Sequence, residues 1–209
     1  ERKGLKIAFL AYTYGTNGLS LPVDSPFAVS YIDEEKIKKD ISKADSLADI
    51  VVVSVHWGVE YQSSANDQQR ALAYQMAKSG ADIIFGHHPH QIQEVEMISN
   101  PDGRKTVVYY SLGNFISSQN KLLTILGGLG RIDLQYLPDE KQLSIKNASF
   151  IPLITHYNQG FRQTQVYPLR DYPPALADKH GIRKYEDFSI SGLENYLHTT
   201  IDSRFLDYK

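Results

Sequence analysis

One stretch decides the fold of this chain, and it reads IVVVSVHWGVE at residues 50–60. Its first six residues form a near-continuous apolar run, which is typical of a strand covered on both faces of a sheet. The run ends at His56, a polar side chain that can bind a metal ion or an anion. Ligands of open α/β sheets sit beyond the carboxyl ends of the strands, so a site is expected at this edge.

Two further segments end in the same way. An apolar run at residues 82–86 leads into the sequence HHPH at 87–90, and another at 107–112 leads into Gly113 and Asn114. Parallel strands place their carboxyl ends at one edge of the sheet, so we expect the three strand ends to line one site. Four of the seven histidines in the chain lie there.

The segments around these runs predict the elements of an α/β sheet. A first strand is expected over residues 5–12, and the acidic residues that follow Asp33 suit the first turn of a helix. A second helix is expected to begin after Asn66 or Asp67 as its cap and to end near Gly80, which fits the C′ position. The next strand follows at once, so the unit is β-α-β with parallel strands.

The middle of the chain predicts antiparallel pairing. An Asn-Pro-Asp-Gly turn is expected to join segments 93–98 and 106–112 as a hairpin. Alternating apolar residues at 130–137 and 143–151 predict two more antiparallel strands, with a turn at 138–141 between them. The expected fold class is therefore α/β, a mixed sheet plus antiparallel strands that form a second sheet packed against the first.

We expect the chain to divide at about residue 155. Residues 1–155 hold the predicted sheets, whereas residues 156–209 are expected to form a tail that is extended beyond Pro168 and carries two consecutive prolines. A terminal helix near residues 191–206 is expected to close the tail and to pack on the rest of the chain.

The composition of the chain narrows the classes of protein that it fits. With 209 residues, 42% hydrophobic and 22% charged, it is ordinary for a globular protein with one sizeable core. The net charge of −2 and the lack of a basic run give no reason to expect nucleic acid as a partner. No stretch approaches the ~20 apolar residues of a membrane-spanning helix. The chain has no Cys, which excludes disulfides and thiolate metal sites.

The histidines at the strand ends have the chemistry of a metal site. Neutral imidazole is the commonest protein ligand for Zn, Mn and Fe ions. Residues two apart in an extended segment point to the same side, so His88 and His90 are expected to reach one ion while His87 points away. His56 is expected to supply a third nitrogen. The alternative is that these imidazoles only cap backbone groups, but several of them buried together without a ligand are hard to satisfy.

Other residues at this edge have more than one interpretation. Glu60 fits a metal ligand, a partner that orients an imidazole, a general acid or base, or a solvated carboxylate. Asn114 follows a glycine and is expected to position a substrate oxygen or a metal ion, unless it only stabilises its own turn. Trp57 is expected to form a pocket wall or part of the core. Asn17 follows the first strand, where it fits a substrate contact less well than a turn.

The carboxylate side of a two-metal centre is missing from this sequence. Such a centre needs bridging and terminal carboxylates to balance two divalent charges. At the ends of the predicted strands the chain has neither an Asp-x-His nor a Gly-Asp. Three neutral imidazoles alone would bind a single zinc-like ion or nothing firmly.

Three separated motifs together resemble a known family. They are HWGVE at 56–60, GHHPH at 86–90 and YSLGNF at 110–115. In this order they resemble the CapA family of bacterial capsule synthesis proteins, which is linked to poly-γ-glutamate capsules. The ending of segment 5–18 and the segment 69–73 fit as well, so the resemblance covers residues 5 to about 152.

The resemblance implies a fold and a set of site residues. The family looks related to calcineurin-like metallophosphoesterases, which implies a partial four-layer α/β/β/α sandwich with metal ions between loops at the strand ends. His56 then matches the lone metal-binding histidine, and His88 and His90 match a terminal His-x-His pair. The doubled His87-His88 leaves that alignment ambiguous by one residue. Family members carry an N-terminal half with acidic motifs that this chain lacks, so the chain resembles the C-terminal portion, with its partner half in cis or on another chain.

Two functions follow as expectations from the resemblance. The first is a metal-dependent hydrolase or transferase of an envelope polymer, with a divalent Mn, Zn or Fe ion and with Glu60 or an imidazole such as His87 as the catalytic proton donor. The second is a non-catalytic subunit that binds the anionic polymer or capsule synthase subunits. A third possibility is that the histidines bind phosphate or a carboxylate without metal. An extracytoplasmic location, anchored through a segment outside this chain, is expected in each case.

Overall fold

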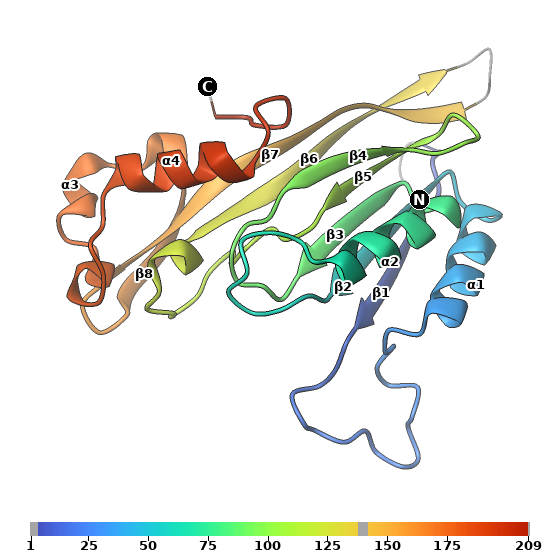
Figure 1. Ribbon diagram of the computed structural model, residues 1–209, viewed down its shortest axis with the longest axis horizontal. Coiled ribbons are helices and arrows are strands. Elements are labelled where there is room, and N and C mark those ends of the chain that lie inside the picture. Colours follow the sequence, from blue (N-terminus) through green and yellow to red (C-terminus); the bar gives the residue numbers. More distant parts are fainter. Residues whose placement is uncertain (1–3, 138–141, 209) are drawn as a thin grey trace.

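The computed structural model describes residues 4–137 and 142–208, which hold two sheets (Figure 1). A hydrophobic core lies between these two sheets. The larger sheet has five strands in the order β1-β2-β3-β5-β4. Its first four strands run parallel, and β4 is antiparallel to β5, which confirms the predicted hairpin and the mixed sheet. The bounds of the five strands are β1 Ile7–Thr13, β2 Ile50–His56, β3 Ile83–His87, β4 Val95–Ser99 and β5 Lys105–Tyr109.

Two helices cover one face of this sheet, as their caps and apolar residues predict. The helix α1 (Glu34–Asp45) begins after Asp33, whose side chain accepts from the backbone N–H of Lys36. The helix α2 (Asp67–Lys78) begins after Asn66, and Ser79 is its C-cap. Gly80 follows with a φ of 112°, the left-handed backbone expected at C′. The buried residues of both helices pack with β2 in one core.

The cap of α2 is expected to contribute measurably to stability. Asn66 accepts from the N–H of Gln69, and the Gln69 side chain accepts from the N–H of Asn66. The change Asn66→Ala removes half of this capping box and is expected to cost about 1 kcal/mol of unfolding free energy. Urea unfolding measures the loss. The exposed Gln68→Ala in the same turn is the control, and an equal effect of both changes would contradict the role of the cap.

The second sheet is antiparallel, as expected, and longer than the sequence predicted. Its strands are β6 (Leu126–Leu137), β7 (Gln142–Asn158) and β8 (Arg162–Pro168). The predicted turn at 138–141 lies outside the described residues. The strand β8 was not predicted, because it lies at the edge of the sheet and carries polar side chains at most positions.

The last quarter of the chain differs from the extended tail that was expected beyond Pro168. It forms short helical segments before a terminal helix that ends earlier than predicted. Pro174 occupies the first turn of one such segment, where the missing N–H of proline costs nothing. These elements are η2 (Leu169–Asp171), α3 (Pro174–Ala177), η3 (Gly181–Lys184) and α4 (Ile190–Thr200); η1 (Leu122–Ile125) precedes β6. The division of the chain at residue 155 stays a prediction.

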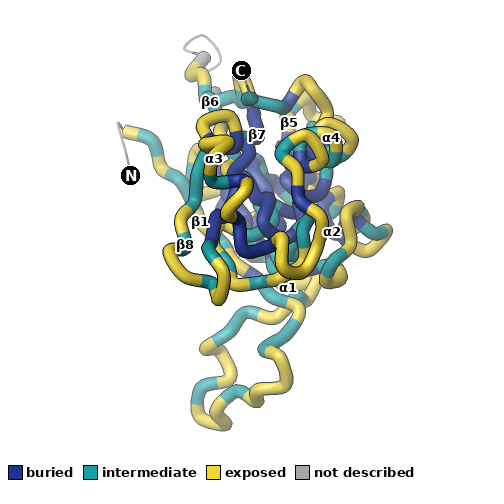
Figure 2. The backbone as a smooth tube through the Cα atoms, turned by 90° about the vertical axis from the view of Figure 1, so that its left-hand side faces the viewer, coloured by how far each residue is buried: buried dark blue, intermediate teal, exposed yellow. Residues whose placement is uncertain are grey.

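Two hydrophobic cores lie between the layers of the fold. One lies between the five-stranded sheet and the helices α1 and α2. The other lies between the two sheets, where Tyr109 of β5 and Phe150 of β7 are fully buried. Leu193 and Leu197 of α4 join this second core, which Figure 2 shows as the buried interior. This α/β/β order with an added helix agrees with the partial sandwich that the resemblance implied.

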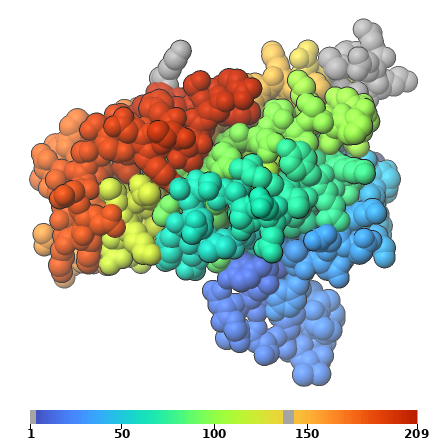
Figure 3. Space-filling model, viewed as in Figure 1, coloured from blue at the N-terminus to red at the C-terminus, as the bar shows by residue number. Residues whose placement is uncertain are grey.

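A loop stands out from the carboxyl end of β1. Figure 3 shows the residues between β1 and α1 projecting as a separate lobe. Leu19, Val23 and Phe27 in this loop are all largely exposed. Within the described residues, no helix has the length and apolar character needed to cross a membrane.

Candidate functional site

The carboxyl ends of three neighbouring strands form one row. Thr13 of β1 pairs with His56 of β2, and His56 pairs with His87 of β3. Paired residues of neighbouring strands point to the same face of a sheet, so His56 and His87 lie side by side on one face. The backbone N–H of Trp57 donates to the carbonyl of His87 at 3.1 Å, which ties the two strand ends together.

His88 and His90 join this row from the loop after β3. The ring centroids of His56 and His88 are 4.7 Å apart, and those of His88 and His90 are 6.2 Å apart. The sequence predicted that His88 and His90 lie on one side because the segment is extended. The segment is bent instead, with φ values of 102° at His88 and 60° at His90. Left-handed backbone is costly for such residues and clusters at functional sites.

Asn114 fixes the orientation of His90. The amide nitrogen of Asn114 donates to the carbonyl of Thr124 at 3.0 Å, so its oxygen faces Nδ1 of His90 at 2.9 Å. Because that oxygen can only accept, Nδ1 of a neutral His90 carries the proton and Nε2 presents a lone pair. Nε2 lies 3.8 Å from Oε1 of Glu60. Asn114 is thus placed to act as a positioning residue, and a direct substrate contact for it stays a prediction.

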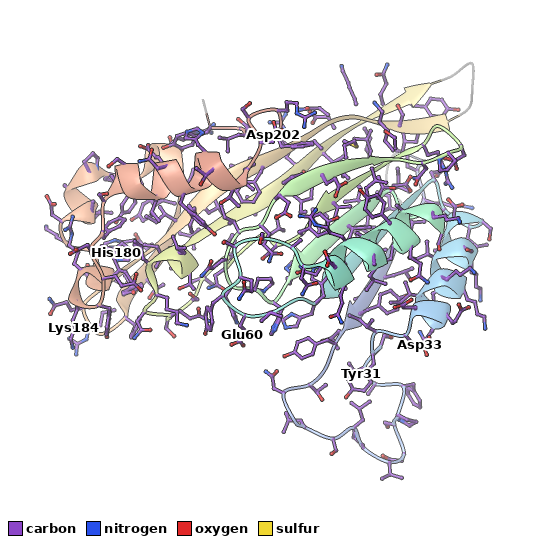
Figure 4. The ribbon with its side chains drawn as sticks, in the orientation of Figure 1. Tyr31, Asp33, Glu60, His180, Lys184 and Asp202 are labelled. Carbon is purple, nitrogen blue, oxygen red and sulfur yellow. The ribbon has the colours of Figure 1, made fainter. Side chains whose placement is uncertain are left out.

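Glu60 is the carboxylate closest to this group of imidazoles. It comes from the loop between β2 and α2 and is about half exposed. Figure 4 shows Glu60 at the end of the sheet from which the loop of residues 14–31 projects. The pair formed by Glu60 and His90 can hold and pass on one proton at the open rim of the site.

Trp57 supports the site from the other face of the sheet. Its indole N–H donates to the carbonyl of Tyr110 at 2.9 Å, and the two rings stack. The side chain is 2% exposed, and it lines a cavity of about 500 Å³ together with Tyr14 and Gly58. Trp57 is therefore both core and pocket wall, the two alternatives that the sequence left open.

Tyr14 is a site residue that sequence reasoning missed. Its ring lies 4.6 Å from that of His88 and 5.8 Å from that of His56. Its hydroxyl donates to the side-chain oxygen of Asn17 at 3.2 Å, which connects Asn17 to the imidazoles indirectly. The signal available was its position directly after the last residue of β1, equivalent to Trp57 after β2.

A cation approaches the site from a distant segment. The ring of Tyr61 stacks with that of His90, with centroids 5.9 Å apart. The ammonium group of Lys121 lies over the ring of Tyr61, 3.2 Å from the centroid of that ring. Local sequence carries no signal for Lys121, because sixty positions separate it from Tyr61. A positive charge at this rim favours an anionic ligand.

Burial favours the neutral form of three imidazoles in this row, those of His56, His87 and His88. Burial lowers the pKa of His56, and the neighbouring imidazoles lower it further. Burial also lowers the pKa of His87 and of His88. Neutral imidazole is the form that binds a metal ion or accepts a proton.

The described part of the chain shows no complete metal site. Among residues 4–137 and 142–208, no group of three or more His, Asp or Glu side chains is arranged to hold a metal ion. His56 and His88 lie together, but only Glu60 adds a carboxylate nearby, and it faces His90. The donors near one another are thus imidazoles with one carboxylate at the rim, and a metal ion bound by His56, His88 and His90 stays a prediction.

Comparisons with known proteins match the region that holds these residues. The family model of the bacterial capsule synthesis protein PGA_cap matches residues 1–119, a shorter range than the 5–152 expected. The PGA biosynthesis protein CapA of Bacillus subtilis (strain 168) is 44% identical over 117 residues, which are 56% of this chain and 29% of that protein. The capsule biosynthesis protein CapA of Bacillus anthracis is 37% identical over 121 residues, 56% of this chain and 28% of that protein. The chain thus spans less than a third of each of these relatives.

Proposed function

This chain belongs to the PGA_cap family of bacterial capsule synthesis proteins, and on that premise we propose that it is the imidazole-bearing part of a capsule biosynthesis hydrolase. The relatives named above carry the names of PGA and capsule biosynthesis proteins. The proposed substrate is an amide of poly-γ-glutamate or a phosphoester of the cell envelope. The proposed location is outside the cytoplasm, with an anchor in a segment beyond this chain.

The observation that carries this proposal is the row of neutral imidazoles. His56, His87 and His88 meet at one sheet edge, and burial favours their uncharged form. Keeping several imidazoles together with strained backbone at His88 and His90 is costly for a purely structural rim. Such groups supply nitrogen donors and proton acceptors to a hydrolytic site.

The missing donors are proposed to come from a second half of the site. We place that half against β1, the edge strand of the five-stranded sheet, which ends at Thr13 beside His56. The side chain of Phe9 on this strand is 75% exposed. On the outer edge of β1, Thr13 pairs with Tyr31, and no strand of the described structure pairs with the rest of that edge. An open edge strand with an exposed aromatic residue is a surface that another chain segment can extend. The complete protein is this chain together with that half.

The experiment compares the complete protein with its His88→Gln variant. Hydrolysis of poly-γ-glutamate and of a model phosphodiester is measured at neutral pH. The variant is expected to lose activity by about tenfold or more, because an imidazole of the row is removed. The exposed His198→Gln is the matched control and is expected to keep full activity. Equal activity of all three proteins would reject the hydrolase.

A second candidate is a non-catalytic subunit that binds the anionic polymer or capsule synthase subunits. The observation that favours it is the incomplete ligand set among the described residues. Capsule output separates the two candidates. A folded His88→Gln protein that supports normal capsule output would favour the binding subunit, whereas loss of capsule would favour the hydrolase.

A further inference from the structure

A second cavity lies far from the imidazole row, at the end of the molecule where His180 is labelled in Figure 4. It has a volume of about 430 Å³, within the range of small-ligand sites. It lies beyond residue 119, outside the part of the chain that matches the family. The residues that matter here are His156, Asn158, Gln163, Gln165, Tyr167 and Lys179.

A directed chain of hydrogen bonds runs from the core into this cavity. The amide nitrogen of Asn158 donates to the side-chain oxygen of Gln163 at 2.5 Å. The oxygen of Asn158 therefore accepts from Nε2 of His156, at 3.2 Å. Burial lowers the pKa of His156, so its neutral ring leaves Nδ1 to accept from the hydroxyl of Tyr172 at 2.8 Å.

This direction leaves donors at the cavity. The oxygen of Gln163 is occupied, and its amide N–H groups donate to no group within the described residues. The side-chain oxygen of Gln165 accepts from the hydroxyl of Tyr167, and the amide N–H groups of Gln165 also donate to no group within the described residues. Two glutamines that line the cavity thus have amide N–H groups without an acceptor among the described residues, while their side-chain oxygens accept within the protein.

Among the described residues, the cavity is lined by one positively charged side chain, that of Lys179, and by no carboxylate. Lys179 contributes an ammonium group that forms no ion pair with any residue of the described chain. No Asp or Glu lines the cavity. A site with a cation, free donors and no carboxylate suits a ligand that is anionic and rich in acceptors.

The backbone beside the cavity is left-handed at two residues. Phe161, in the turn between β7 and β8, has a φ of 57°, and Gln163, the second residue of β8, has a φ of 52°. A left-handed conformation at two residues other than glycine costs free energy and points to a role for the turn.

We propose that this cavity binds a carboxylate of an anionic γ-glutamyl chain, with Lys179 facing the carboxylate and the Gln163 and Gln165 amides facing its oxygens. The choice of a γ-glutamyl chain rests on the proposed function in capsule biosynthesis. The donor-rich chemistry of the cavity does not depend on it. The imidazole row and this cavity are then separate places on one polymer-handling protein.

The test measures binding of a synthetic γ-linked glutamate decamer to the 209-residue chain by calorimetry at low salt. The variant Lys179→Gln is expected to bind about tenfold more weakly, because one charge-assisted contact is lost. The control Lys184→Gln makes the same change of charge at a side chain that lies over the Tyr185 ring, outside the cavity. It is expected to bind nearly as the wild type does.

Further arms separate this inference from the hydrolase. The neutral γ-linked glutamine decamer is expected to bind at least about tenfold more weakly than the glutamate decamer. His198→Gln, an exposed histidine outside both sites, is expected to bind the glutamate decamer normally. The assay measures binding and not hydrolysis, so its outcome does not depend on that of the His88→Gln hydrolysis experiment. Equal weakening by Lys179→Gln and Lys184→Gln, no binding of the decamer by the wild type, or free glutamate binding as tightly as the decamer would each overturn the inference.

Discussion

Gly86→Ala is expected to destabilise the protein by about 3 kcal/mol or more, because β3 has no room for a methyl group at this position. A Cβ atom on Gly86 would lie 2.0 Å from the carbonyl oxygen of Tyr110 and 2.5 Å from the indole nitrogen of Trp57. Both neighbours are fixed, since they are joined by a hydrogen bond and belong to the core. The strand β3 lies in the middle of the sheet, so it cannot move aside alone.

Urea unfolding measures this effect, and the chain provides a matched control. Gly15→Ala changes a glycine that has no neighbour within 4 Å of an added Cβ and no left-handed φ. Its free energy of unfolding is expected to change by less than about 0.5 kcal/mol. Similar values for the two variants would show that the close approach of β3 to Tyr110 and Trp57 does not exist in solution.

His180 is expected to make the protein less stable as the pH falls, by about 3 kcal/mol between pH 7 and pH 4. Its Nε2 donates to the carbonyl of Thr155 at 3.0 Å, and its Nδ1 accepts from the N–H of Ile182 at 3.1 Å. A second proton on this ring would have to displace the Ile182 contact in a side chain that is 2% exposed. Burial accordingly lowers the pKa of His180 from 6.5 to about 4.

The sign of the effect follows from which state binds the proton first. Above pH 6.5 the imidazole is neutral in both states and stability is unaffected. Between pH 6.5 and about 4 the unfolded chain takes up the proton and the folded chain does not, so the unfolding free energy falls. Burial raises the pKa of Asp82 to about 6, and that group changes stability in the opposite direction. The contribution of Asp82 cancels when the wild type is compared with a His180 variant, because both proteins contain Asp82.

The measurement is urea unfolding of the wild type and of His180→Gln at several pH values. Glutamine keeps a donor and an acceptor but does not titrate, so the loss of stability on acidification is expected to be about 3 kcal/mol smaller in the variant. His198→Gln removes an exposed imidazole and is expected to leave the pH dependence unchanged. Parallel pH profiles for the wild type and His180→Gln would contradict the burial of a neutral His180.

Local patterns predicted the elements with strong signals. The apolar run at Ile50, the cap at Asn66 and the turn before β5 each agree with the structure, because propensity, capping and burial point the same way there. The strand β8 and the short helices after it were missed. No residue of β8 is fully buried, so pairing with β7 rather than local pattern holds this strand in place. The short helices are held by single apolar residues, such as Leu169 and Ile182, that reach the core between the sheets.

For the site as well, one part could be predicted from the sequence and another part could not. His56, His88, His90 and Asn114 were predicted to share one place, and ring contacts and a hydrogen bond join them. The bent backbone at His88 could not be read from the sequence, because it depends on the neighbouring loop. The N–H of Tyr61, for example, donates to the carbonyl of Pro89 at 2.8 Å. Lys121 reaches the site only through tertiary packing.

The metal content of the complete protein shows whether the imidazole row is one half of a metal-dependent site, as proposed above. Elemental analysis after purification at neutral pH is expected to find about one or two equivalents of a divalent metal in the wild type and in His198→Gln. His88→Gln is expected to lose most of it. A wild type without metal, or a His88→Gln protein with the same metal content as the wild type, would show that the imidazole row does not hold a metal ion.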